Sequence, residues 1–196
     1  MFGKEKMVMR QQNRIVIDIV LVALFTSITF VATSIQVPMP ALIGKPFVHL
    51  GNSAVLLSVL LLGYKRGALA GGFGLALFDV MHGYAMEAPY YFVECFIVGG
   101  VAAYVFSLVN YKQHGTNLKL ILVILSAVFA KLVMTTGHNF VMSLFKGMTL
   151  QPAIIATISS LFPTIINCIT TLVVVFVIYR VLAEQFKRLF VRNNFS

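Results

Sequence analysis

Residues 47–94 read FVHLGNSAVLLSVLLLGYKRGALAGGFGLALFDVMHGYAMEAPYYFVE and decide the fold, because apolar runs alternate here with acids, histidines and glycines. Two apolar runs, at about 48–63 and 67–81, are joined by a basic turn at 63–67. Each run is shorter than the roughly 20 residues that a helix needs to cross about 30 Å of hydrocarbon. Short, glycine-interrupted segments beside polar residues are typical of membrane transport proteins, in which irregular backbone lines a cavity. The stretch therefore predicts a ligand site inside a membrane protein.

The composition of the 196 residues fits this class, since 59% are hydrophobic and only 11% are charged. Such a chain has no room for a separate soluble domain, so we expect one integral membrane domain over 1–196. The net charge of +9 comes from bases at helix ends and short loops, which disfavours a nucleic-acid partner. Cys95 and Cys168 fall in apolar segments and are expected to act as small hydrophobes, without a disulfide or a metal site.

Apolar runs predict an all-α membrane protein with six transmembrane helices. Their expected bounds are about 15–35, 48–63, 67–81, 90–109, 118–145 and 152–182. The first run is too long for the core of a signal peptide and is expected to be retained as a helix. Residues 36–47 hold three prolines and predict a structured loop, because proline removes a helix donor. Gly67, Gly71 and Gly74 share one helical face and predict close approach of a neighbouring backbone.

The positions of Lys and Arg predict the orientation, because short cytoplasmic loops carry the excess of positive charge. With a cytoplasmic N-terminus, only Lys45 and Lys146 fall in outside loops, and Lys131 lies within a helix. The other twelve of the fifteen bases (15 − 3) then lie inside. We therefore expect both termini in the cytoplasm and the Pro/Gly-rich segments 36–48 and 82–89 outside.

Polar residues recur at helical spacing within the last three predicted helices, or just before the first of them in the case of Glu87. These stripes are Glu87, Tyr91 and Glu94, then Lys131, Thr135, His138 and Met142 with Asn139 beside them, then Ser160, Thr164, Asn167 and Thr171. Ionisable groups in a membrane normally face the bundle interior or a wet cavity, so the stripes predict a polar pocket in the outer half. The predicted substrate-binding residues are His49, Asn52, Asp79, Tyr84, Glu94, His138, Asn139 and Asn167.

Two simpler interpretations stay open for these polar residues. Ser160, Thr164 and Thr171 have hydroxyls that can bond to their own helix. Glu94 and Lys131 can form a structural ion pair between two helices.

The segments FVHLGNSAVLL at 47–57 and LLGYKRGALAGGFGLALFDVMHGYAMEAP at 61–89, with the late Asn167, resemble a known family. They are similar to the substrate-binding S component of energy-coupling factor (ECF) vitamin transporters, in the branch with riboflavin-type and hydroxymethylpyrimidine or pyridoxine transporters. The resemblance implies a six-helix protein of the bacterial cytoplasmic membrane that binds a vitamin near the extracellular face. It also implies three partners, namely a transmembrane coupling subunit and two cytoplasmic ATPase subunits.

The resemblance further implies that helix 1 packs on the coupling subunit through an Ala-x-x-x-Ala motif. Here Ala23 and Ser27 stand at that spacing, so a serine replaces the second alanine. Many relatives have Gly-Asp where this chain has Gly51 and Asn52, and a basic residue near the position of Glu94. We expect a vitamin-binding transport subunit that is not an enzyme, carries no cofactor and takes its energy from partners, because the chain has no nucleotide-binding motif. The acids, histidines, asparagines and tyrosines favour pyridoxine or hydroxymethylpyrimidine as the substrate.

Two alternatives come from other classes. A proton-coupled secondary transporter would relay protons through Asp79, Glu94 and His138, but the sequence has no convincing internal repeat. An intramembrane enzyme would use His138 or His49 with an acid, but no nucleophile elbow or HExxH motif is present.

Overall fold

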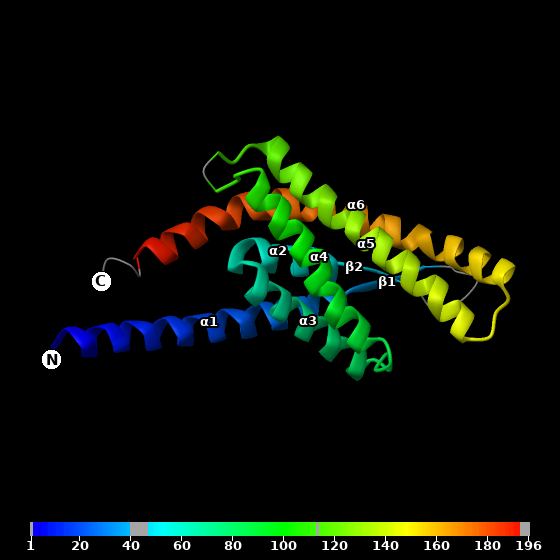
Figure 1. Ribbon diagram of the computed structural model, residues 1–196, viewed down its shortest axis with the longest axis horizontal. Coiled ribbons are helices and arrows are strands. Elements are labelled where there is room, and N and C mark those ends of the chain that lie inside the picture. The colour runs from blue at the N-terminus through cyan, green and yellow to red at the C-terminus, as the bar shows by residue number, and fades with distance from the viewer. Residues whose placement is uncertain (1, 40–46, 113, 193–196) are drawn as a thin grey trace.

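The computed structural model describes residues 2–39, 47–112 and 114–192, with side chains at 12–39, 47–112 and 114–185 (Figure 1). The described residues form six helices and a two-stranded sheet. The helices are α1 (Phe2–Ser34), α2 (Gly51–Leu62), α3 (Tyr64–Met81), α4 (Ala88–Leu108), α5 (Asn117–Phe145) and α6 (Leu150–Arg192). The strands are β1 (Gln36–Pro38) and β2 (Phe47–His49).

The predicted helix bounds need correction at several ends. α1 begins before residue 15, and α6 extends beyond 152–182 at both ends, because their polar, basic extensions contain no proline. The basic turn at 63–67 is wrong in extent, since Gly63 alone joins α2 to α3 and the bases lie in the first turn of α3. Gly63 has φ of +87° and ψ of 166°, a backbone conformation open essentially to glycine only, so one residue can reverse the chain.

Four helical segments are long and apolar enough to cross a membrane, which makes this a multi-pass membrane protein. They are Gln12–Ser34, Ala88–Leu108, Asn117–Phe145 and Leu150–Gln185. α2 has only 12 residues, and α3 carries Lys65, Arg66 and Asp79. The prediction of six complete spans therefore stays a prediction for α2 and α3.

The short helix α2 is the centre of the bundle. It packs against α1, α3, α4 and α6, and nine of its twelve residues are buried. Leu56 and Leu57 join the main apolar core with Leu120, Val123 and Ile124 of α5. Because protein surrounds α2, its backbone does not need the length of a lipid-spanning helix.

Glycines let α3 approach its neighbours closely, as their spacing predicts. Gly67 and Gly71 lie against Val59 and Val55 of α2, whereas Gly74 lies against Thr29 of α1. The three glycines therefore permit close contact with two neighbouring helices and not one, because α3 lies between α1 and α2.

Part of the predicted loop 36–47 is a strand pair, which the all-α prediction lacks. β1 and β2 pair antiparallel, with Val37 opposite Val48, and β2 displaces the expected start of α2 from residue 48 to Gly51. Residues 40–46, including Lys45, lie outside the described residues.

Figure 1 shows the start of α1, the end of α6 and the α4–α5 connection at one end of the bundle. The strands and the α3–α4 and α5–α6 connections lie toward the other end, which we call the loop end.

Candidate binding cavity

A cavity of about 400 Å³ opens at the loop end of the bundle. Its lining comes from β2, from all six helices and from the α3–α4 and α5–α6 connections. This volume falls in the roughly 300–1,000 Å³ range of pockets that hold drug-sized ligands. The cavity is the first candidate for the polar pocket that the sequence predicts.

Most of the predicted site residues meet at this cavity. Seven of the eight line it, namely His49, Asn52, Asp79, Tyr84, His138, Asn139 and Asn167. Glu94 does not line it, but lines a second cavity of about 40 Å³ between α2, α4, α5 and α6. Asn52, Leu75, Lys131 and Asn167 line both cavities, so the two are neighbours. Contact of these residues with a substrate stays a prediction.

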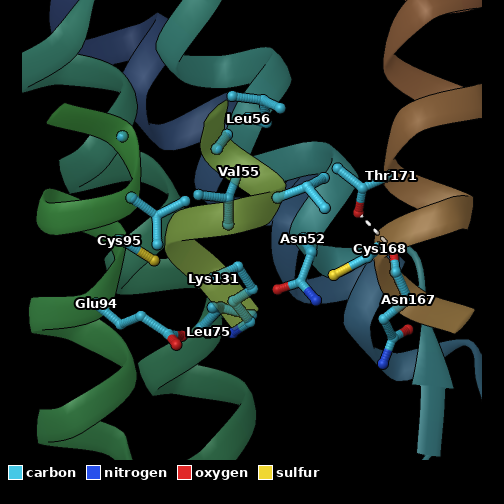
Figure 2. A pocket seen from close by; sticks show the side chains of 14 residues that line it. Asn52, Val55, Leu56, Leu75, Glu94, Cys95, Lys131, Asn167, Cys168 and Thr171 are labelled. Atoms are coloured by element: carbon cyan, nitrogen blue, oxygen red, sulfur yellow. Dashed lines mark hydrogen bonds and ion pairs between the residues drawn. The ribbon is translucent and has the colours of Figure 1, made fainter. Parts of the chain in front are cut away.

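Glu94 forms the centre of a polar network between α4 and α5. Its side chain is 2% exposed and makes an ion pair with Lys131, toward which it points in Figure 2. Its other oxygen accepts hydrogen bonds from the Tyr90 hydroxyl at 3.0 Å and from Thr135 at 3.3 Å. The structure thus contains the ion pair that the sequence left open, and the buried carboxylate of Glu94 is bonded to three protein groups.

A second pair lies nearer the loop end. Nε2 of His138 is 2.7 Å from an oxygen of Glu87, and the His138 ring stacks on Tyr90 with a centroid separation of 3.6 Å. Lys131 also lies over the ring of Tyr91, 5.1 Å from its centroid. Aromatic rings and charged groups therefore hold the α4 and α5 side of the cavity in one arrangement.

Polar groups of α6 are mostly bonded within the protein. Asn139 donates to the Ser160 hydroxyl at 2.8 Å. The hydroxyls of Ser160, Thr164 and Thr171 each donate to a backbone carbonyl of their own helix. The simpler interpretation of these three hydroxyls is confirmed.

Asn167 forms hydrogen bonds with the free edge of β2. Its side-chain oxygen accepts from the backbone N–H of His49 at 2.9 Å, and its amide nitrogen donates to the carbonyl of Phe47 at 3.1 Å. On a strand, the backbone groups of residues two apart point to the same side. The one side-chain amide of Asn167 can therefore bond to both Phe47 and His49. Asn167 lines the cavity, but its amide holds the strand that carries His49 in place.

The protonation of His49 follows from its contacts. Its Nδ1 accepts from the backbone N–H of Gly51 at 3.1 Å, so the ring proton resides on Nε2. Burial, with a further contribution from the charge of Lys131, lowers the pKa of His49 to about 3. His49 is therefore neutral at physiological pH and can donate through Nε2.

The family follows from a comparison of the whole sequence. The model of the family described as "ECF-type riboflavin transporter, S component" matches residues 13–184. The chain belongs to this family. S components of this kind are parts of transporters, which agrees with the expectation of a transport subunit and not an enzyme.

The fold of this S component agrees with a solved structure described as the S component of a bacterial ECF transporter. The TM-score is 0.63, with 23% identity over 90% of this chain and 99% of that chain. At this identity the likeness concerns the fold alone. No curated protein matches the sequence.

Several lining residues of the S component were missed from its sequence. Phe47, Thr33 and Pro163 line the cavity but belong to none of the predicted polar stripes. Phe47 packs beside His49, with 5.3 Å between ring centroids. Phe47 could have been predicted as a lining residue, because it is close in sequence to the predicted site residue His49. Thr33 and Pro163 gave no signal that separates them from ordinary helix residues.

We expect Asn167→Ala to weaken substrate binding because it frees β2 and His49. Two hydrogen bonds are lost, each contributing about 0.5–1.5 kcal/mol, so the affinity should fall about 5- to 150-fold. Titration of the purified variant measures this change. Thr170→Ala is the matched control, since that hydroxyl bonds only to its own helix, at the carbonyl of Ile166. Equal affinity of Asn167→Ala and the wild type would show that the hydrogen bonds between Asn167 and β2 do not position the site.

Proposed function

We propose that this S component binds riboflavin in the cavity at the loop end. The observation that carries the proposal is the cavity volume of about 400 Å³. A single ring with hydroxymethyl groups, as in pyridoxine or hydroxymethylpyrimidine, would fill only part of this space. The three-ring flavin with its hydroxylated side chain suits the space better, and the printed family description also names riboflavin.

The lining supports a planar ligand with many hydroxyls. Phe47 and Tyr84 lie together at the cavity with 6.1 Å between ring centroids, and Tyr91 lines it from α4. Aromatic rings favour offset stacking or edge contacts with a flat ligand ring. Side chains such as Asn139, Ser143 and Thr164 also line the cavity, and their oxygens can meet hydroxyl groups.

Binding of candidate vitamins to the purified protein tests the substrate. We expect riboflavin fluorescence to be quenched at one molecule per chain, with neither pyridoxine nor hydroxymethylpyrimidine competing in large excess. Competition by either single-ring compound, without quenching of riboflavin, would instead support the substrates expected from the polar residues alone.

We further propose that α1 binds a transmembrane coupling subunit, which acts with two cytoplasmic ATPases. Ala23 and Ser27 are exposed on α1, and the Ser27 hydroxyl donates to the carbonyl of Ala23 at 3.0 Å. This bond satisfies the hydroxyl within its own helix, so both residues present a small surface that permits close helix contact.

Replacing Ala23 or Ser27 by Phe should abolish ATP-dependent uptake by the assembled transporter. Vitamin binding by the isolated chain should stay unchanged, because neither residue lines the cavity. Ile28→Phe is the control, since Ile28 is an exposed residue of the same helix and is already large. Loss of binding together with uptake, or equal loss in the Ile28 variant, would refute this surface.

We also propose that the loop end faces the outside and both termini face the cytoplasm. Labelling of single cysteines tests this in a background without Cys95 and Cys168. Cysteine at the exposed position Ala85 should react with an impermeant reagent in intact cells, and cysteine at the exposed position Lys65 should not. The reverse pattern would overturn the orientation.

A further inference from the structure

The two sides of the cavity differ in how their polar groups are bonded. On the side formed by α4, α5 and α6, most of the charged and amide side chains are paired with protein groups. These pairs are Glu87 with His138, Asn139 with Ser160, and Asn167 with β2. The part of the lining formed by β2, α2 and α3 carries His49, Asn52 and Asp79, which we call the open wall.

Asp79 is the most unusual member of the open wall. Its side chain is 6% exposed and lines the cavity, and its buried Oδ2 has no hydrogen-bond partner in the part of the chain that the structure describes. A buried acceptor without a partner is costly, and more so when it is charged. Buried polar groups are nearly always satisfied, so this oxygen is placed to receive a donor from a ligand.

Asn52 offers both kinds of hydrogen bond. It lines the large and the small cavity, and Figure 2 shows its amide pointing into the space between Lys131 and Asn167. Among the described side chains and backbone, it has no hydrogen-bond partner. An amide has two donor protons and an acceptor oxygen, so Asn52 can complement either an N–H or a carbonyl.

His49 is a donor at its free ring atom. Its Nδ1 is used by the backbone of Gly51, which leaves the Nε2 proton for the cavity. The open wall thus presents an acceptor at Asp79, a donor at His49 and an amide at Asn52 that can act as either.

The groups beside Asp79 suit an organic ligand. No group of three or more His, Cys, Asp or Glu residues that could hold a metal occurs within the described residues. The neighbouring neutral groups, His49 and Asn52, suit a ring edge with uncharged donors and acceptors.

We propose that the open wall binds the polar edge of the substrate ring. Asp79 accepts a hydrogen bond from a ring N–H, and His49 and Asn52 donate hydrogen bonds to the acceptors beside that N–H. The substrate class is a planar heterocycle with a neutral N–H next to carbonyl or ring-nitrogen acceptors. This inference rests on the proposed function. In riboflavin the edge is the imide, in which the N3–H lies between two carbonyls.

The test compares riboflavin with its N3-methyl derivative, which lacks the ring N–H but keeps both carbonyls. Wild-type protein should bind riboflavin about 5- to 150-fold more tightly than the derivative, since loss of the hydrogen bond leaves the buried acceptor of Asp79 unpaired. Asp79→Ala, which removes the acceptor, should weaken riboflavin binding by a similar factor and bind the two flavins about equally. Asp18→Ala is the matched control, because this carboxylate pairs with Arg66 outside the cavity.

Each outcome is decisive. Undiminished riboflavin affinity in Asp79→Ala, or a preserved preference for riboflavin over the N3-methyl compound in that variant, overturns the role of Asp79 alone. Failure of the wild type to bind riboflavin overturns the proposed substrate and this inference together. Should Asp79→Ala not fold, equal binding of both flavins by the wild type would still refute recognition of the N–H.

Discussion

Gly67→Ala should prevent accumulation of folded protein in the membrane. A Cβ atom at this position would lie 2.3 Å from Cα of Val59, 2.4 Å from its nitrogen and 2.5 Å from the carbonyl carbon of Ser58. All three are backbone atoms of α2, so no side-chain rotation can relieve the clash. The helices would have to separate, and overpacking of this kind is among the few mechanisms that cost more than about 4 kcal/mol.

A second interaction makes this position less tolerant still. The Ser58 hydroxyl lies 2.8 Å from the carbonyl of Gly67 and 2.7 Å from that of Val55, and its side chain is fully buried. Separation of α2 from α3 would break the hydrogen bond from Ser58 to Gly67 and leave the hydroxyl with the Val55 carbonyl alone. Because α2 also contacts α1, α4 and α6, the disturbance would spread to the whole bundle.

Gly137→Ala is the matched control for the Gly67 variant. Gly137 lies within α5, and a Cβ atom there would meet nothing within 4 Å. Alanine is the better helix former by up to about 1 kcal/mol, so this variant should fold at least as well as the wild type. Yield and thermal unfolding in detergent measure both changes. Wild-type stability of Gly67→Ala would mean that α2 and α3 do not pack as closely as described.

The helices could be predicted from the sequence because long apolar runs leave few alternatives in a membrane. The runs at 90–109 and 118–145 match α4 and α5 within one or two residues. The glycine spacing of α3 likewise predicted close packing, but it could not say which helix is the neighbour. Gly74 meets α1 while Gly67 meets α2, and only the three-dimensional arrangement separates these cases.

The strand pair could not be predicted, because its signal is short and its partners are distant. β1 and β2 have three residues each, and β1 includes Pro38, which is rarely found inside strands. Their stability depends on α6, since Asn167 occupies the free edge of β2. Along the chain, Asn167 is 118 positions from His49 and 120 positions from Phe47. Contacts between residues so far apart leave no local pattern in the sequence.

The candidate site was predicted as a set of residues, but its internal pairing was not. Helical spacing identifies the face of a helix, so His138, Asn139 and Asn167 could be assigned to one pocket. Spacing does not identify partners across helices, and the bond from His138 to Glu87 was missed for that reason. Seven predicted residues line the cavity, yet several of them are bonded to protein groups, which the sequence could not show.

Lys131→Met should destabilise the protein by about 3–5 kcal/mol, the usual cost of removing one partner of a buried ion pair. Glu94 is 2% exposed, and without Lys131 its carboxylate would keep only the hydrogen bonds from Tyr90 and Thr135. Two neutral donors do not replace the charge that offsets desolvation of a buried carboxylate. Unfolding by heat or denaturant in detergent measures the loss.

The double variant Glu94→Gln with Lys131→Met separates the ion pair from other effects of the lysine. Glutamine keeps an oxygen that can accept from Tyr90 and Thr135 but carries no charge, so the uncompensated carboxylate is gone. Replacing both partners of a buried pair is often nearly neutral, and the double variant should therefore recover most of the stability lost in Lys131→Met. The cation of Lys131 also lies over the ring of Tyr91. If the single and the double variant are equally unstable, the lysine stabilises the fold through this ring and not through Glu94.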